Sequence, residues 1–226
     1  MTVTSSSHPQ WTVRWRLIVF LLAATSLACL LADFYGICSM KLFTVAVFLP
    51  AMVLLMALGV FDFERGNGRL AAAVLIGAIA GLAAAVAYDV FRLPFVFARQ
   101  WGIASVVPPL NLFKVFPAFG AMILGQPVQQ AAYSTTVSLI GWAYHFSNGM
   151  TIGVMYLALI GDARRRHWAW AIAVAVGLEL GMLLTPYSRV FRIPVTVNFV
   201  AVTMSAHAVF GVCLGLAARA MALKTI

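Results

Sequence analysis

The chain has 226 residues, of which 63% are hydrophobic and only 9% are charged, and its mean hydropathy is +0.99. A soluble domain would carry about a quarter charged residues, so this composition excludes a soluble globular protein. In so apolar a chain the net charge of +9 is first a signal of membrane topology, and it does not indicate nucleic-acid binding. We therefore expect an all-α integral membrane protein.

Six apolar segments are each close to the roughly 20 residues that cross a bilayer as a helix. In chain order they are Leu17–Ala32, Leu42–Val60, Leu70–Phe91, Thr135–Ile160, His167–Tyr187 and Val195–Ala218. A helix satisfies its backbone hydrogen bonds within one segment, as hydrocarbon requires. The sequence therefore predicts a six-span transmembrane helical bundle.

The first segment also resembles a secretory signal peptide, because Arg14 and Arg16 precede its apolar run. Before Cys29, where a lipoprotein cleavage box would carry an apolar residue, this chain has Ser26. We favour an uncleaved first span, and cleavage stays open. None of the three cysteines has a spacing that indicates a disulfide framework or a metal site.

Basic residues are unequally divided between the two sides of the predicted bundle. The side of the N-terminus carries most of them, namely Arg14, Arg16, Arg65, Arg69, Arg164, Arg165, Arg166, Arg219 and Lys224. The other side carries Lys41, Arg92, Arg99, Lys114, Arg189 and Arg192. Because cytoplasmic loops are enriched in Lys and Arg, we expect both termini in the cytoplasm, in a bacterial inner (plasma) membrane. The Arg164–Arg166 run is interpreted first as a topology determinant and second as a contact for anionic lipid.

The long connection from Arg92 to Ser134 contains several prolines and the apolar segment Asn111–Gly125. That segment is too short to cross a bilayer. A re-entrant or interfacial helix on the outer face is therefore predicted, and an irregular outer loop is the alternative.

The chain contains an internal duplication, in which a glycine pair and a Phe-Arg-x-Pro precede a His-x-x-x-Gly-x-x-x-Gly helix. The aligned copies are Gly77, Gly81 and Val90–Pro94, and then Gly177, Gly181 and Val190–Pro194. We predict two N-terminal transmembrane helices over 1–69, a first repeat over 70–160 with an outer insertion at 95–132, and a second repeat over 161–226. Both copies cross the membrane in the same sense, so a pseudo-twofold axis along the membrane normal is expected.

Each of the four repeat helices carries a small-x-x-x-small element, which lets helix backbones approach closely in lipid. The pairs are Gly77 and Gly81, Gly149 and Gly153, Gly177 and Gly181, and Gly211 and Gly215. We expect a compact four-helix core with the first two helices packed outside it.

His145 and His207 begin the two His-x-x-x-Gly-x-x-x-Gly elements, near the middle of their spans. Four-residue steps keep each histidine on the face of its glycines, so both should point into the core at similar depth. The favoured interpretation is a pair of hydrogen-bonded interhelical struts in a non-catalytic interaction or accessory membrane protein. Its partners would be the lipid bilayer and a second copy of the chain or a larger membrane complex.

One alternative gives this histidine pair a haem or a transition metal, in a redox membrane protein. A metal would take Glu179 as a third ligand at about the right depth. Glu179 is expected to point away from the glycine face, however, and close glycine packing would leave no room for a porphyrin.

A second alternative is a proton-coupled small-solute transporter, with the histidine pair carrying protons. Its outer gate would be an ion pair of Asp89 with Arg189, the aligned residue of the second repeat. A local contact of Asp89 with Arg92 is equally open. No Gly-rich phosphate loop, HExxH element or serine triad indicates a catalytic site.

The fourth and sixth spans, with His145-x-x-x-Gly149 and His207-x-x-x-Gly211, resemble a loose group of small uncharacterised bacterial polytopic membrane proteins that share such helices. The resemblance covers about the last two-thirds of the chain. It implies no activity, cofactor or partner.

Overall fold

The computed structural model describes residues 11–66 and 68–224, with side chains as far as residue 222. Its elements are α1 (Val13–Phe34), α2 (Met40–Phe43), the π-helical segment η1 (Thr44–Phe48), α3 (Leu49–Glu64), α4 (Arg69–Val96), α5 (Val115–Leu124), α6 (Thr135–Ile160), α7 (Trp170–Leu183), α8 (Tyr187–Val190) and α9 (Val197–Lys224). Helices make up 73% of the described residues, and these residues contain no strand, so the all-α prediction is confirmed. The outer limits of the first and third predicted parts, residues 1–10 and 225–226, lie outside the described residues.

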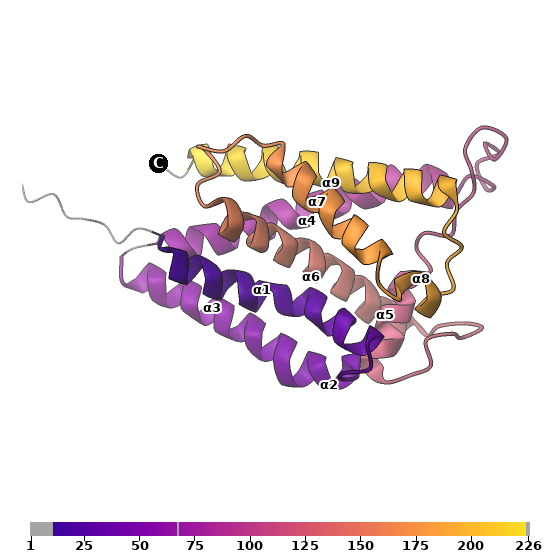
Figure 1. The fold of residues 1–226 in the computed structure, drawn as a ribbon, viewed down its shortest axis with the longest axis horizontal. Helices are drawn as coiled ribbons and strands as arrows, with labels where there is room; N and C mark the ends of the chain where they lie inside the picture. The colour runs from indigo at the N-terminus through magenta and orange to yellow at the C-terminus, as the bar shows by residue number, and fades with distance from the viewer. Residues whose placement is uncertain (1–10, 67, 225–226) are drawn as a thin grey trace, which may run out of the picture.

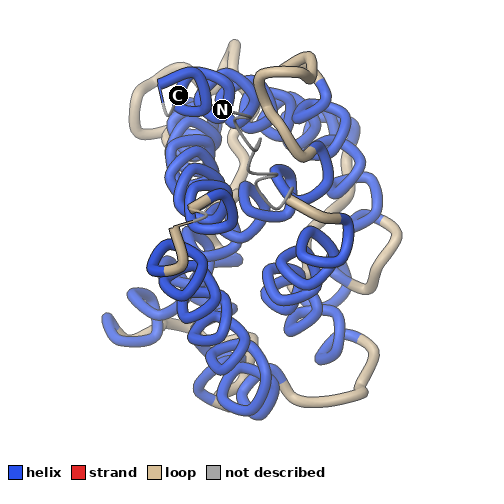
Figure 2. The backbone as a smooth tube through the Cα atoms, turned by 90° about the vertical axis from the view of Figure 1, so that its left-hand side faces the viewer, coloured by secondary structure: helices blue, strands red, loops and turns tan. Residues whose placement is uncertain are grey.

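The long helices run along one common direction (Figure 1). α5 and α8 lie at one end of the bundle, which we call the α5 end. The opposite end, which we call the arginine end, holds the first residues of α1 and α4 and the last residues of α6 and α9. Figure 2 views the bundle nearly end-on, from the arginine end, and shows the foreshortened helices grouped side by side.

Four helices of the described chain are long and apolar enough to cross a membrane, which indicates a membrane protein. They are Val13–Phe34, Met40–Glu64, Arg69–Val96 and Val197–Ala222, matching the first, second, third and sixth predicted spans. The fourth predicted span forms as α6, but polar residues in its middle lower its hydropathy, so it is not among these four helices. The fifth shortens to α7, which ends before Pro186, because a proline disfavours helical backbone in the residue before it. Six spans are therefore not confirmed and stay a prediction.

α4 and α6 pack with no side chain between their backbones. A Cβ atom added to Gly81 would overlap the carbonyl oxygen of Gly149, and one added to Gly153 would overlap that of Gly77. The two glycine pairs therefore lie face to face, as their spacing predicts for helices in lipid.

α7 and α9 use their glycines differently. A Cβ atom on Gly211 would lie 2.5 Å from the Cα of Ile172 in the first turn of α7, and one on Gly215 would overlap the carbonyl of Trp168, just before α7. Gly177 and Gly181 have no atom within 4 Å of such a Cβ position. Their predicted packing role is not realised, because α7 runs obliquely from α9 towards α8 (Figure 1).

The two predicted Phe-Arg-x-Pro corners have different structures. Val90–Pro94 lies inside α4, which continues to Val96, whereas Val190–Pro194 spans the end of α8 and a turn with Arg192 at a φ of 49°. α4 also packs extensively on α9, and no equivalent interface joins α6 to α7. The duplication and its pseudo-twofold axis therefore remain predictions from the sequence.

The predicted short helix within Asn111–Gly125 forms as α5, so that segment is not an irregular loop. It packs closely on α6, because a Cβ atom on Gly120 would overlap the carbonyl of Val137 and one on Gly141 would overlap that of Phe116. α5 is therefore a buried part of the bundle, and α1 and α3 cover α6 and α4 from outside.

The two glycine pairs that align in the sequence are expected to respond differently to the same change. Gly81→Ala forces α4 off α6 and should lower stability by about 1–3 kcal/mol. Gly181→Ala meets open space and should be neutral or stabilising by up to about 1 kcal/mol, because alanine favours helix. Thermal melting in mild detergent measures both. Equal destabilisation by the two variants would contradict this packing.

Candidate functional site

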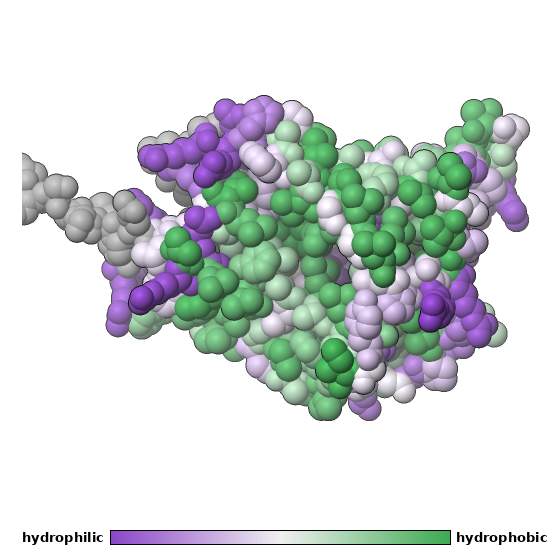
Figure 3. Space-filling view, in the orientation of Figure 1, coloured by the Kyte–Doolittle hydropathy of each residue, from purple (hydrophilic) through white to green (hydrophobic). Residues whose placement is uncertain are grey.

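A cavity of about 390 Å³ lies towards the α5 end of the bundle, with walls from α1, α4, α5, α6, α7 and α9. Gly177 and Gly181 belong to its lining, so the missing side chains of α7 help to create the space. Its apolar lining includes Leu30, Phe116 and Phe210. Its polar and ionisable lining residues include Tyr88, Arg92, His145, Asn148, Glu179 and His207. Figure 3 shows the corresponding face hollowed between α1 and α7.

The first polar cluster joins α4 to α6 around Asp89. The Nε2 atom of His145 lies 2.9 Å from Asp89 Oδ2, and Arg92 Nη1 donates to Asp89 Oδ1 at 3.3 Å. Arg92 also donates to the carbonyl of Leu112 at 2.5 Å, and its guanidinium lies 4.5 Å from the centre of the Tyr88 ring. Asp89 and Arg92 are buried, and one helical turn separates them on α4. The close α4–α6 contact brings His145 to the same carboxylate.

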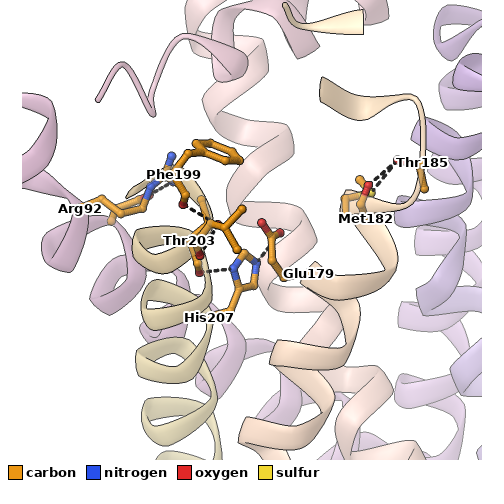
Figure 4. Close-up of polar contacts among 9 residues, drawn as sticks. Arg92, Glu179, Met182, Thr185, Phe199, Thr203 and His207 are labelled. Carbon is orange, nitrogen blue, oxygen red and sulfur yellow. Dashed lines mark hydrogen bonds and ion pairs between the residues drawn. The ribbon is translucent and has the colours of Figure 1, made fainter. Parts of the chain in front are cut away.

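The second polar cluster joins α9 to α7 (Figure 4). The Nδ1 atom of His207 lies 2.9 Å from the carbonyl oxygen of Thr203, and its Nε2 atom lies 3.5 Å from Glu179 Oε2. Because a carbonyl can only accept, Nδ1 carries a hydrogen. The other ring nitrogen, Nε2, faces the Glu179 carboxyl group, so a basic and an acidic group lie side by side in the lining of the cavity.

Two aromatic rings connect the clusters. The ring of Tyr88 lies 4.9 Å from that of His207 and 6.0 Å from that of His145, between centroids. Phe116 stacks on His145 at 4.1 Å. Neither aromatic residue was identified from the sequence. The position of Tyr88 beside Asp89 within a span was an available signal, whereas nothing in the sequence places α5 against the histidine.

Two buried polar atoms on cavity residues have no hydrogen-bond partner. They are Arg92 Nε, a donor, and Asn148 Oδ1, an acceptor. Each such atom costs about 1–3 kcal/mol if it stays unpaired. A polar group of a bound molecule, or an ordered water, is the usual explanation for such atoms.

Glu179 does not point away from the core, as its position opposite the glycine face led us to expect. It faces His207 on α9. The expectation assumed that Gly177 and Gly181 form the helix interface of α7. They meet no neighbouring helix of the described chain, and the opposite side of α7, which carries Glu179, packs on α9 instead.

The hypothesised Asp89–Arg189 ion pair is not formed. Asp89 is occupied by Arg92 and His145, and Arg189 lies exposed on α8. The local alternative holds because α4 continues as a helix beyond Asp89 and keeps Arg92 on the same face. Arg92 is also 3% exposed, so it is not a loop charge on the outer side.

The residues present do not fit the haem or metal interpretation. Within the described ranges, no group of three or more His, Cys, Asp or Glu side chains is close enough to hold a metal ion. Both His145 and His207 direct Nε2 at a carboxylate. Ligation of a haem through these atoms would break both contacts and leave two buried carboxylates without their partners.

No family model, no curated protein and no solved structure matches the chain. The resemblance to small bacterial proteins with His-x-x-x-Gly helices therefore stays a prediction.

The Asp89–Arg92 contact is expected to appear as energetic coupling. Asp89→Ala leaves a buried guanidinium without its carboxylate and should cost about 3–5 kcal/mol. The double variant with Arg92→Ala should cost clearly less than the sum of the single variants. Arg189→Ala is the matched control, and its effect should add to that of Asp89→Ala. Thermal melting in mild detergent measures the cycle, and coupling to Arg189 instead of Arg92 would contradict the structure.

Proposed function

We propose that this protein is a non-catalytic membrane protein that binds a lipid-soluble molecule with a small polar head in the cavity between His145 and His207. We further propose six spans in a bacterial inner membrane with both termini in the cytoplasm. The gathering of Arg16, Arg69 and Arg164–Arg166 around a cavity at the arginine end supports that orientation, because cytoplasmic ends of spans are enriched in basic residues.

The observation that carries the proposal is the composition of the 390 Å³ cavity. Small-molecule sites are concave and mostly apolar, with a few convergent polar groups, and this cavity lies within the usual range of about 300–1,000 Å³. Leucine, phenylalanine and methionine side chains line it together with the two histidine and carboxylate pairs. A molecule with an apolar body and a hydrogen-bonding head matches both parts.

The interpretation of the histidines as struts accounts for only part of this geometry. His145 holds α6 to α4 and His207 holds α9 to α7, as struts would. A strut requires no empty space beside it, yet Gly177 and Gly181 leave such space next to Glu179. Ionisable groups buried within membrane spans are costly and usually functional, so their collection around a cavity favours a binding role.

The surroundings of the cavity favour access from the bilayer. Leu21 on α1 and Leu180 on α7 are 57% and 52% exposed, and Leu184, just after α7, is 88% exposed. Figure 3 shows hydrophobic surface on both sides of the hollow. A ligand that dissolves in lipid can reach the hollow between α1 and α7 without crossing a polar surface.

Filling the cavity should remove the ligand while leaving the fold intact. Gly181→Leu adds a side chain where no atom lies within 4 Å of the new Cβ, so it should lower ligand occupancy about tenfold. Leu180→Phe, on the lipid-facing side of the same helix, is the matched control and should keep the occupancy of the wild type. Native mass spectrometry of protein extracted in mild detergent measures the bound mass.

Two results would contradict this assignment. One is a wild-type protein that carries no small molecule, or a Gly181→Leu variant that carries the same molecule at the same occupancy as the wild type. The other is a Soret band that disappears in His145→Ala and His207→Ala, which would show haem at the histidines.

Proton-coupled small-solute transport is the second candidate, and one observation favours it. The Tyr88 ring contacts both His145 and His207, and each histidine faces a carboxylate, so titratable groups follow one another across the cavity. Such chains of acidic and histidine residues carry protons in transporters.

A proton-flux measurement separates the two candidates. Our proposal expects proteoliposomes with a trapped pH dye to acidify no faster than empty vesicles under an imposed gradient. Proton flux that disappears in both His145→Phe and His207→Phe would instead establish the transport function.

A further inference from the structure

A second and larger cavity, of about 1040 Å³, lies at the arginine end of the bundle. Its walls come from the start of α1, the start of α4, the end of α6 with the loop that follows, and the end of α9. Five arginines line it, namely Arg16, Arg69, Arg164, Arg165 and Arg166. Asp162 is the one carboxylate among the described residues of this lining, so the cavity is strongly cationic.

Only part of this positive charge is matched inside the protein. Arg164 and Arg165 lie 3.0 Å and 3.6 Å from the oxygens of Asp162, and the hydrogen-bonded Arg164 guanidinium holds the pKa of that carboxyl below its usual range. Asp162 therefore stays ionised and counts as one negative charge. Among the described residues, neither Arg69 nor Arg166 has an acidic partner.

Arg16 has a fixed position in the wall. Its Nε donates to the carbonyl of Ala158 at 2.7 Å, and one Nη donates to the carbonyl of Leu159, at the end of α6. These carbonyls lack partners within the helix, and a cation next to them is favoured by the helix dipole. The guanidinium is thus held in place before any ligand arrives.

Two further features of the cavity suit a lipid better than a free ion. Apolar residues of α4 and α6, including Ile76, Leu157 and Ile160, belong to its lining. Trp11, also in the lining, has a buried indole Nε1 atom with no hydrogen-bond partner. An acceptor oxygen in the cavity would pair with that donor, and an acyl chain would cover the apolar wall.

We propose that this cavity binds an anionic phospholipid, with the phosphate at the arginines and the upper acyl chain against α4 and α6. Guanidinium groups bind phosphate oxygens through two parallel hydrogen bonds, which gives both strength and specificity. The cavity lies where the apolar helices end, at the level of lipid headgroups. This site is separate from the cavity at the α5 end, and it stands whether or not that cavity binds a ligand.

Lipid binding to the delipidated full chain in mild detergent tests the proposal. Native mass spectrometry should show tighter binding of phosphatidylglycerol than of phosphatidylcholine. Arg165→Gln with Arg166→Gln should weaken phosphatidylglycerol binding about tenfold and leave phosphatidylcholine binding unchanged. Arg99→Gln with Arg189→Gln removes the same charge at the α5 end and should keep the preference of the wild type.

The double variant Arg165→Lys with Arg166→Lys keeps the positive charge, so it should retain most of the preference for phosphatidylglycerol. This control distinguishes a lost binding site from a misfolded protein. Equal binding of the two lipids by the wild type would overturn the proposal, and so would a preference unaffected by the glutamine pair. Inorganic phosphate that displaces bound phosphatidylglycerol at equal phosphate concentration would assign the site to a free anion and would also overturn it.

Discussion

The contact between α4 and α6 is the constraint on which the rest of the structure depends. Gly77 and Gly81 lie against Gly149 and Gly153 with no side chain between the two backbones. In lipid, apolar side chains gain little by burial against one another, so close backbone packing is the main source of helix association. This contact sets the register of the two helices, and the register places His145 beside Asp89.

The second helix pair departs from the first, and the candidate site results from that difference. α9 packs its glycines on the start of α7, after which the two helices diverge. Gly177 and Gly181, which align in sequence with a packing pair, therefore border a cavity. The two histidines consequently have unlike surroundings, since His145 shares its carboxylate with a buried arginine, whereas His207 lies between Glu179 and the carbonyl of Thr203.

Two cavities in this bundle gather ionisable side chains, and each suits a different chemistry. The cavity at the α5 end combines paired acids and bases with apolar walls, as expected of a site for a small amphiphilic molecule. The cavity at the arginine end has excess positive charge above an apolar floor, as expected of a phospholipid site. The remaining surface exposes many large apolar side chains, as a surface facing lipid would.

Composition and hydropathy alone determined the helical class and four helices that are apolar and long enough to cross a membrane, because these depend on local pattern and on what hydrocarbon excludes. Only the tertiary structure decided which side chains contact the two histidines. Phe116 contacts His145 because α5 packs on α6, and Glu179 meets His207 because the side of α7 opposite its glycines faces α9. Equal glycine spacing in two helices cannot show which pair packs, since the answer depends on the angle at which each helix meets its neighbour.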